Sequence, residues 1–300
     1  MGETLGSNWG WVSEWLNLVL RWAHLVAGIS WIGSSFYFMW LDSSLEPAPK
    51  GQEDKIAGHL WMVHSGGFYR VEKRFLGAGE VPPNLHWFKW EAAFTWLTGF
   101  SLLMLIYYSG GLLVDAGNPT VSEGTAAAVG IGTLVVGWFV YDFMWMRIER
   151  HKAIGNVISY ALLVAVAFGL TKVFGARAAY IHVGALMGTL MVLNVWVRIL
   201  PAQREMIGAT QAGVKRNVVL GERAKGRSVH NNYMTFPVLF IMISSHFPST
   251  YGNDWNWLVL ALLILASAGV RHHMNVNKRR TLWMVGAAAL ILIALGYATR

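Results

Sequence analysis

The chain has 300 residues, of which 55% are hydrophobic and only 13% are charged, and its formal net charge is +8. Because an average soluble domain carries about a quarter charged residues, this composition excludes an ordinary soluble globular protein. The chain contains no cysteine. That absence excludes disulfides, thiolate metal sites and a covalently attached c-type haem, which needs a C-x-x-C-H run.

Eight apolar segments follow one another along the chain, and most approach the roughly 20 residues that a helix needs to cross a bilayer. In chain order they are Trp15–Leu41, Glu91–Tyr108, Gly124–Trp145, Val157–Phe174, Ala178–Leu200, Tyr233–His246, Trp255–Val270 and Leu282–Ala298. The sixth is too short unless its helix already begins near Ser228. We predict an all-α polytopic membrane helical bundle of about eight transmembrane helices, forming a single integral membrane domain over residues 1–300.

The positions of lysine and arginine predict the orientation of this bundle. Of the 24 such residues, 19 lie in four alternate connections, which are 42–90, 147–154, 201–232 and 271–281. Cytoplasmic loops carry the excess of positive charge in membrane proteins, so we place these connections inside and both termini outside. This topology explains the net charge of +8, and a nucleic-acid partner is not needed to account for it.

The connection 42–90 is too long to be a passive link and is predicted to be a cytoplasmic insertion. Two short apolar or aromatic runs in it, Leu60–Val63 and Phe68–Val71, flank His64-Ser65-Gly66-Gly67. This pattern predicts a β-hairpin over a glycine turn. Long ordered loops are often functional, so we expect the hairpin to form a lid or a wall of a site.

Three histidines lie in the outer half of the predicted bundle. His24 lies nine residues into the first span, His182 enters the fifth, and His246 closes the sixth. Ionisable residues inside a membrane are functional candidates by default. A neutral imidazole there can bind haem or a metal ion, relay protons, or form a hydrogen bond between helices. The sequence alone leaves these alternatives open.

A second polar group gathers at the inner ends of the spans. Its members come from the third, fifth, sixth and seventh segments and are Asp142, Asn194, His230, Asn231, Asn232, Arg271 and His272. One interpretation is a polar rim at the membrane interface. The other is a binding site, because many donors converge here from different helices.

Several stretches closely resemble the bacterial membrane-integral urate oxidases, or urate hydroxylases, that carry a C-terminal cytochrome c. They are LNLVLRWAHLVAGISWIGSSFYFMWLDSSLEP (17–48), LWMVHSGGFYRVEK (60–73), LHWFKWEAAFTWLTGF (85–100), VGWFVYDFMW (136–145) and RSVHNNYMTFPVLFIMISSHFPSTYG (227–252). The resemblance is collinear over essentially the whole chain. It implies a bacterial inner-membrane protein, with both termini periplasmic, that oxidises urate to 5-hydroxyisourate and passes electrons to cytochrome c.

One departure from that family concerns the cytochrome. Its attachment cysteines are missing here, so either the cytochrome c domain is removed or a separate cytochrome c serves as the acceptor. A fainter resemblance concerns the first span, where His24 precedes Trp31-Ile32-Gly33. Small membrane bundles of the copper-resistance and haem-linked protoporphyrinogen oxidase kind have a similar histidine that binds haem b. This implies haem b held by His24 together with His246 or His182.

The resemblance leads to a hypothesis for the site at the cytoplasmic mouth, where urate would bind between the hairpin and the sixth and seventh spans. The residues expected to bind the substrate by charge, hydrogen bonds or stacking are Arg70, Trp90 (or Phe68), Asn231, Asn232, Arg271 and His272. The candidates for the catalytic base are His64, His86 and His230. Two other interpretations remain, namely a urate or purine transporter without a redox cofactor, and a haem-binding or assembly subunit of another redox complex.

Overall fold

The computed structural model describes residues 2–115, 121–276 and 279–300, and side chains from residue 10 onward. Its helices are α1 (Gly2–Ser44), α2 (Trp90–Leu103), α3 (Glu123–Ile148), α4 (Lys152–Leu170), α5 (Ala176–Leu193), α6 (Leu200–Ala212), α7 (Val218–Ser244), α8 (Pro248–Tyr251), α9 (Asn256–Val276) and α10 (Leu282–Ala298). Two π-helical segments, η1 (Met104–Tyr108) and η2 (Asn194–Ile199), continue α2 and α5, and η3 (Arg279–Thr281) is a short 3₁₀ turn. The two strands are β1 (Ile56–His64) and β2 (Gly67–Arg74).

Among the described residues, seven helices are long and apolar enough to cross a membrane. They are Gly10–Ser44, Trp90–Tyr108, Glu123–Ile148, Lys152–Leu170, Ala176–Ala212, Asn256–Val276 and Arg279–Ala298. They contain or closely match seven of the eight predicted segments, which confirms the helical bundle. The sixth predicted segment lies in α7, whose 27 residues are long enough, although His230, Asn231 and Asn232 reduce its apolar character.

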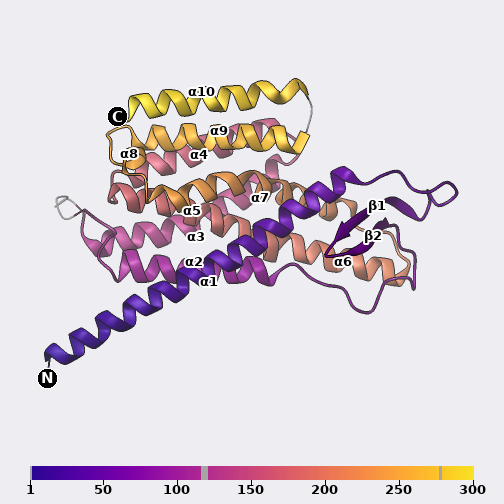
Figure 1. Ribbon diagram of the computed structural model, residues 1–300, viewed down its shortest axis with the longest axis horizontal. Coiled ribbons are helices and arrows are strands. Elements are labelled where there is room, and N and C mark those ends of the chain that lie inside the picture. The colour runs from indigo at the N-terminus through magenta and orange to yellow at the C-terminus, as the bar shows by residue number, and fades with distance from the viewer. Residues whose placement is uncertain (1, 116–120, 277–278) are drawn as a thin grey trace.

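Both chain termini lie at the same end of the bundle, and the hairpin lies at the opposite end (Figure 1). A chain whose ends lie on one side must traverse the bundle an even number of times. Counting α7 with the seven apolar helices satisfies this condition. We refer below to the two ends as the hairpin end and the terminal end.

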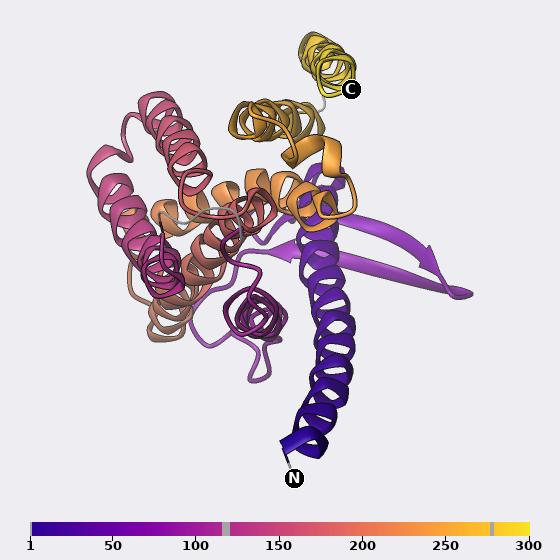
Figure 2. The same cartoon turned by 90° about the vertical axis from the view of Figure 1, so that its left-hand side faces the viewer.

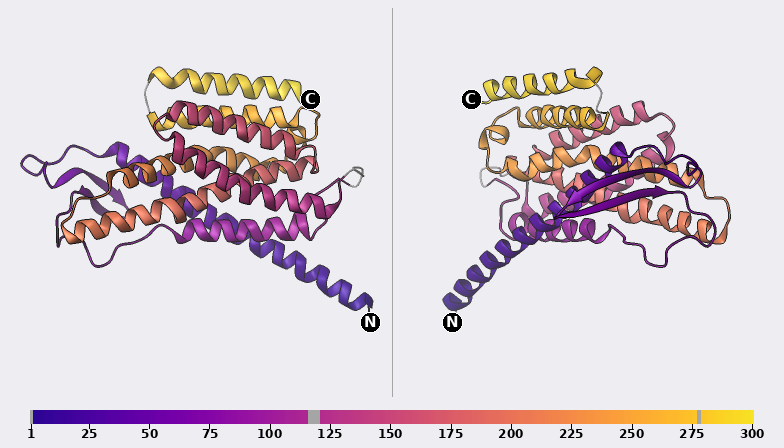
Figure 3. Two further views of the ribbon diagram at one scale, coloured as in Figure 1. Left: turned by 180° about the vertical axis from the view of Figure 1, so that it is seen from behind. Right: turned by 45° about the vertical axis from the view of Figure 1, so that its right-hand side comes forward.

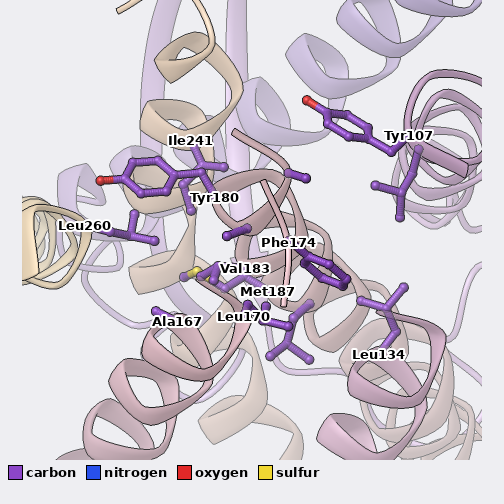
Figure 4. Packing of buried hydrophobic residues seen from close by; sticks show 14 of the residues in the cluster. Tyr107, Leu134, Ala167, Leu170, Phe174, Tyr180, Val183, Met187, Ile241 and Leu260 are labelled. Atoms are coloured by element: carbon purple, nitrogen blue, oxygen red, sulfur yellow. The ribbon is translucent and has the colours of Figure 1, made fainter. Parts of the chain in front are cut away.

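Helix α5 lies at the centre of the bundle and contacts α2, α3, α4 and α7. The view along the helices shows this arrangement, with α10 at one edge beside α9 (Figure 2). Small residues allow close approach, because a Cβ on Gly184 would lie 2.6 Å from a methyl of Ile241 on α7. Side chains from η1, α3, α4, α5, α7 and α9 meet in the core around Val183 and Met187 (Figure 4).

Helix α1 lies obliquely across one face of the bundle, where it packs mainly against α2. Figure 3 shows from two further sides that its N-terminal part projects away from the other helices and that its C-terminal end leads to the hairpin. Helix α1 exposes large apolar side chains over its first thirty residues, such as Trp15, Trp22 and Ile29. This exposure fits a helix whose surroundings are lipid rather than water.

The β1–β2 hairpin is antiparallel, with Trp61 opposite Arg70 and His64 opposite Gly67. Ser65 and Gly66 form its two-residue turn and both have positive φ, at 50° and 76°. Positive φ at both positions is the type I′ geometry whose twist matches that of paired strands. The predicted hairpin is therefore present, although its strands extend beyond the predicted runs because Ile56, Gly58 and His59 also pair with β2.

Candidate functional site

A cavity of about 1020 Å³ opens at the hairpin end of the bundle. Its walls are the C-terminal half of α1, the connection between β2 and α2, the η2–α6 segment and the first half of α7. The polar side chains that line it are Ser34, Ser35, Gln203, Thr210, Ser228, Asn231 and Asn232, and the charged ones are Asp42, Arg74, Lys215 and Arg216. The cavity therefore has many uncharged hydrogen-bonding groups, and cations outnumber carboxylates around it.

Aromatic rings form one side of this cavity. Phe38 on α1 meets Phe88 edge to face at 4.9 Å between ring centroids, and His86 meets Phe88 at 4.6 Å. Trp31 and Trp87 also line the space. Planar aromatic ligands stack well against such rings, so the cavity suits a flat heterocycle.

The most unusual charge beside the cavity is Arg271 on α9, which is only 3% exposed. Its Nε donates to Oδ1 of Asn232 at 3.1 Å, and its guanidinium lies 4.0 Å from the ring centroid of Phe36. Asn275 also donates to Oδ1 of Asn232, at 2.7 Å. In the described parts of the chain no carboxylate pairs with Arg271. A buried cation normally requires a charge partner, so this one is suited to bind an anion.

A second polar cluster lies behind the cavity around Asp142 on α3. The Asp142 carboxylate accepts hydrogen bonds from Arg198 on η2 at 2.9 Å and from Arg227 on α7 at 2.7 Å. Tyr141 lies under the Arg227 guanidinium at 4.7 Å, and its hydroxyl accepts from Asn194 at 3.0 Å. Two cations share one carboxylate, which leaves an excess positive charge near the cavity.

The π-helix η2 explains how two polar residues reach this cluster. Asn194 and Arg198 are four residues apart at the start and near the end of η2. Both bond to α3, and Asn194 also bonds to α7. π-Helical turns are uncommon and occur frequently at functional sites. Sequence reasoning missed Arg198 and Arg227, although Arg198 lies within a predicted span and could have been recognised as an ionisable residue in a membrane segment.

Four predicted site residues are brought together at the hairpin end. His86, Asn231 and Asn232 line the cavity, and Arg271 contacts Asn232. Asn231 is held in place because Asn194 donates to its Oδ1 at 2.9 Å and its own Nδ2 donates to the backbone of Met191. Sequence reasoning missed the neighbours of this group on α1 and α9, which are Phe36, Met39 and Asn275.

Three predicted residues of the helical part lie near the cavity but not on its wall. His230 points toward α3, where its Nδ1 lies 2.7 Å from the Tyr141 hydroxyl and its ring 4.1 Å from that of Trp145. His272 Nδ1 lies 2.6 Å from the Tyr233 hydroxyl. Trp90 packs edge to face against Trp196.

The hairpin does not bring its predicted residues to the cavity. His64 is exposed beside the turn, Phe68 is 82% exposed, and Arg70 pairs with Glu72 at 2.8 Å. The part of the 42–90 connection that lines the cavity runs from Arg74, the last residue of β2, to Phe88, and Asp42 joins it. Apart from Arg74, the wall is therefore formed by the segment that follows the hairpin.

Toward the other end of the bundle, His24 lies against α2. Its Nδ1 is 3.0 Å from the carbonyl oxygen of Thr95 and 3.1 Å from Oγ1 of Thr98. Because a carbonyl only accepts, Nδ1 carries the proton, and Nε2 presents a lone pair. Gly99 makes room for the ring, since a Cβ there would lie 2.8 Å from its Cε1.

The other two histidines of this group differ in their surroundings. His182 is fully buried; its Nδ1 donates to the Ala178 carbonyl at 2.8 Å, and its Nε2 accepts from the Tyr108 hydroxyl at 3.0 Å. His246 is exposed. The described residues contain no group of three or more His, Asp or Glu side chains placed to hold a metal ion.

The fold and the site define a helical bundle of membrane type with an anion-suited, aromatic-lined cavity at one end. Within this class, the family model described as Urate oxidase N-terminal matches residues 10–299. The chain belongs to that family. No curated protein and no solved structure matches the chain. Family membership confirms the urate-oxidase part of the resemblance described above.

Proposed function

We propose that this protein is an integral membrane urate oxidase that converts urate to 5-hydroxyisourate and passes the electrons to cytochrome c. The observation that carries the proposal is Arg271, a buried guanidinium that has no carboxylate partner among the described residues and lies beside a large cavity. Urate at neutral pH is a planar monoanion, so it supplies the charge that Arg271 lacks. Membership of the urate oxidase family supports the choice of this anion.

In this proposal the residues of the cavity have separate roles. Arg271 binds the anionic edge of urate, because a guanidinium suits planar acceptors. Asn232 adds an amide donor beside it. Phe38 and Phe88 provide rings against which the purine packs, while Asn231 keeps its place through Asn194 and shapes the wall.

The proposed reaction adds one water to urate and releases two protons and two electrons, which yields 5-hydroxyisourate. His86 is the one of the three predicted bases that lines the cavity. Its imidazole is suited in kind to act as a general base. His230 then serves as a support for Tyr141 and α3 rather than as the base, since it lies on another face of α7.

The two-electron substrate and the one-electron acceptor imply a redox cofactor, and we propose haem b. His24 would hold the haem iron, because metal-binding histidines usually donate one ring N–H to a carbonyl or carboxylate and keep the other nitrogen free for the metal. His182 would offer its Nε2 only if the Tyr108 hydroxyl turned away, and His246 would bind from the surface. When bound, haem supplies one-electron transfer between substrate and cytochrome.

We further infer that the hairpin end faces the cytoplasm of a bacterial inner membrane. The support is the concentration of lysine and arginine in the connections 42–90, 147–154, 201–232 and 271–281. Both termini then lie on the periplasmic side, where c-type cytochromes work. Urate would enter the cavity from the cytoplasm, and electrons would leave at the terminal end.

The test uses the full chain in lipid nanodiscs with urate and oxidised cytochrome c. We expect urate consumption that depends on cytochrome c, with two cytochromes reduced per urate and little hydrogen peroxide. Arg271→Ala should raise KM at least about tenfold, since hydrogen bonds to charged groups contribute about 1.5–3 kcal/mol. Lys50→Ala, an exposed change in the 42–90 connection, is the matched control.

Two outcomes would contradict the proposal. Uptake of labelled urate into vesicles, without its oxidation, would identify the protein as a transporter. Failure of urate to bind at all would point to a subunit of another redox complex.

A further inference from the structure

Met39 occupies a specific position between Arg271 and the cavity. Its side chain lines the cavity, and its sulfur lies 3.3 Å from Nη2 of Arg271. The side-chain amide of Asn232 also donates to this sulfur. Two hydrogen-bond donors from two helices, α7 and α9, therefore converge on one atom of α1.

The direction of both donors is fixed by the groups around them. Oδ1 of Asn232 accepts from Nε of Arg271 and from Asn275, so the NH₂ group of Asn232 must point the other way, toward Met39. Phe36 covers the Arg271 guanidinium at 4.0 Å from one side, and Phe236 lies 5.4 Å from it. The donors are thus oriented before any ligand arrives.

The acceptor in this arrangement is poorly matched to its donors. A thioether sulfur is a weak acceptor, whereas a buried guanidinium is stabilised best by an anionic oxygen. Methionine is also unbranched and flexible, and it adapts easily to a new neighbour. The donors of Arg271 and Asn232 therefore point at a side chain that can move aside.

We propose that the Met39 sulfur stands in the place of a ligand oxygen, and that a planar organic anion displaces it to reach Arg271 and Asn232. With urate as that anion, the inference rests on the proposed function. Met39 then acts as a specificity residue. A ligand gains access only if its acceptor oxygen, carrying negative charge, binds the two donors more strongly than the thioether does.

A substitution series at residue 39 tests this role by isothermal titration of urate into the protein in nanodiscs. Met39→Leu keeps the volume but removes the acceptor, and it should bind urate as tightly as the wild type or more tightly. Met39→Gln places a neutral oxygen near the donors, and binding should weaken. Met39→Glu places a carboxylate on Arg271, and urate binding should weaken at least about tenfold.

The matched control is Ser43→Glu, which adds the same charge one turn of α1 beyond Met39, at an exposed residue that does not line the cavity. It should leave urate binding unchanged. Equal urate affinity in Met39→Glu and the wild type would overturn the inference. So would equal weakening in the Leu, Gln and Glu variants, because that result would show a packing role only.

Thermal stability separates this inference from the identity of the ligand. Met39→Glu should unfold at a higher temperature than Met39→Gln, because the new carboxylate pairs with Arg271, a buried cation that no carboxylate of the described residues contacts. If the wild type binds no urate, the proposed function fails, but the unfolding temperatures of Met39→Glu and Met39→Gln still test whether position 39 is a place for an anionic oxygen. Equal unfolding temperatures of these two variants would overturn the inference about Met39.

Discussion

The side-chain amide of Asn194 donates to Oδ1 of Asn231 at 2.9 Å. This bond joins the cluster around Asp142 to the wall of the cavity, because Asn194 also donates to the Tyr141 hydroxyl. A change in the cluster can therefore alter the cavity through one side chain that is fully buried.

Asn194→Ala should lower both stability and urate turnover. The change leaves the buried acceptors of Asn231 and Tyr141 without their donor, which costs about 1–3 kcal/mol. We expect a lower unfolding temperature and a lower kcat/KM from the misplaced Asn231. Asn156→Ala, at an exposed asparagine on α4, should change neither value. Unchanged turnover in Asn194→Ala would show that the two clusters are independent.

Asp142→Asn should be the most destabilising single change at the hairpin end. It removes the one carboxylate shared by Arg198 and Arg227, and Arg227 is only 2% exposed. Breaking a buried ion pair costs about 3–5 kcal/mol. Chemical unfolding in detergent measures this loss, with Asp254→Asn at an exposed position as the control. A loss no larger than that of the control would mean that Asp142 does not balance these cations.

Stability at acidic pH should depend on Glu149, which follows α3. The hydrogen bonds from Arg223, at 2.9 and 3.0 Å, lower the pKa of Glu149 below its usual value. A carboxyl group whose pKa is lowered by folding stabilises the protein at pH values above the pKa that it has in the unfolded chain, which is about 4.3 for glutamate. That contribution is lost as the pH falls through the folded pKa.

Unfolding temperatures of the wild type and Glu149→Gln should therefore differ modestly at neutral pH and converge below about pH 4. The difference should be small because both side chains are partly exposed. A difference in unfolding temperature that grows as the pH falls would have the opposite sign and would contradict the ion pair between Glu149 and Arg223.

Absorption spectra test the proposed place of haem. The purified wild type should show a Soret band that is lost in His24→Ala. Gly99→Ala should weaken or shift the band, because the added Cβ would lie 2.8 Å from the imidazole. Gly132→Ala is the control, since its Cβ would meet nothing within 4 Å. A wild-type protein without haem or metal would remove this part of the mechanism.

Fusions to alkaline phosphatase test the orientation of the chain. The enzyme is active only outside the cytoplasm, so a fusion after Arg300 should be active and one after Arg223 inactive. The reason is that Arg223 lies in a basic connection and Arg300 at the terminal end. The reverse pattern would place the hairpin end and its cavity on the outside.

Much of the fold could be predicted because the signals are local. The apolar segments have the length that a membrane crossing needs, and the Ser65-Gly66 turn has the composition of a tight hairpin. The helix through His230, Asn231 and Asn232 was also foreseen as a polar opening of the sixth segment. Each of these predictions depends only on residues close together in the sequence.

The candidate site was less predictable because it depends on helix rotation and on distant contacts. Successive residues of a helix point about 100° apart, so His230 faces α3, Asn231 bonds to η2 and Asn232 meets Arg271 on α9. The sequence of a helix with neighbours on several sides does not show which direction leads to the cavity. The contact of Met39 with Arg271 joins residues 232 positions apart, and no local sequence pattern predicts it.

The π-helix η2 has a consequence for the register of its helix. A π-helical turn is equivalent to one extra residue within an α-helix. Deleting one residue between Asn194 and Ile199 should therefore restore a regular α-helix and leave the helices on either side of it in nearly the same rotation, because the wide turn absorbs the extra residue. The helix before η2 would keep its core contacts and α6 would keep the face that lines the cavity, but the turn that carries Asn194 and Arg198 to the Asp142 cluster would be lost. A deletion at η2 would therefore act first on this cluster, and it would reach the cavity through the bond from Asn194 to Asn231.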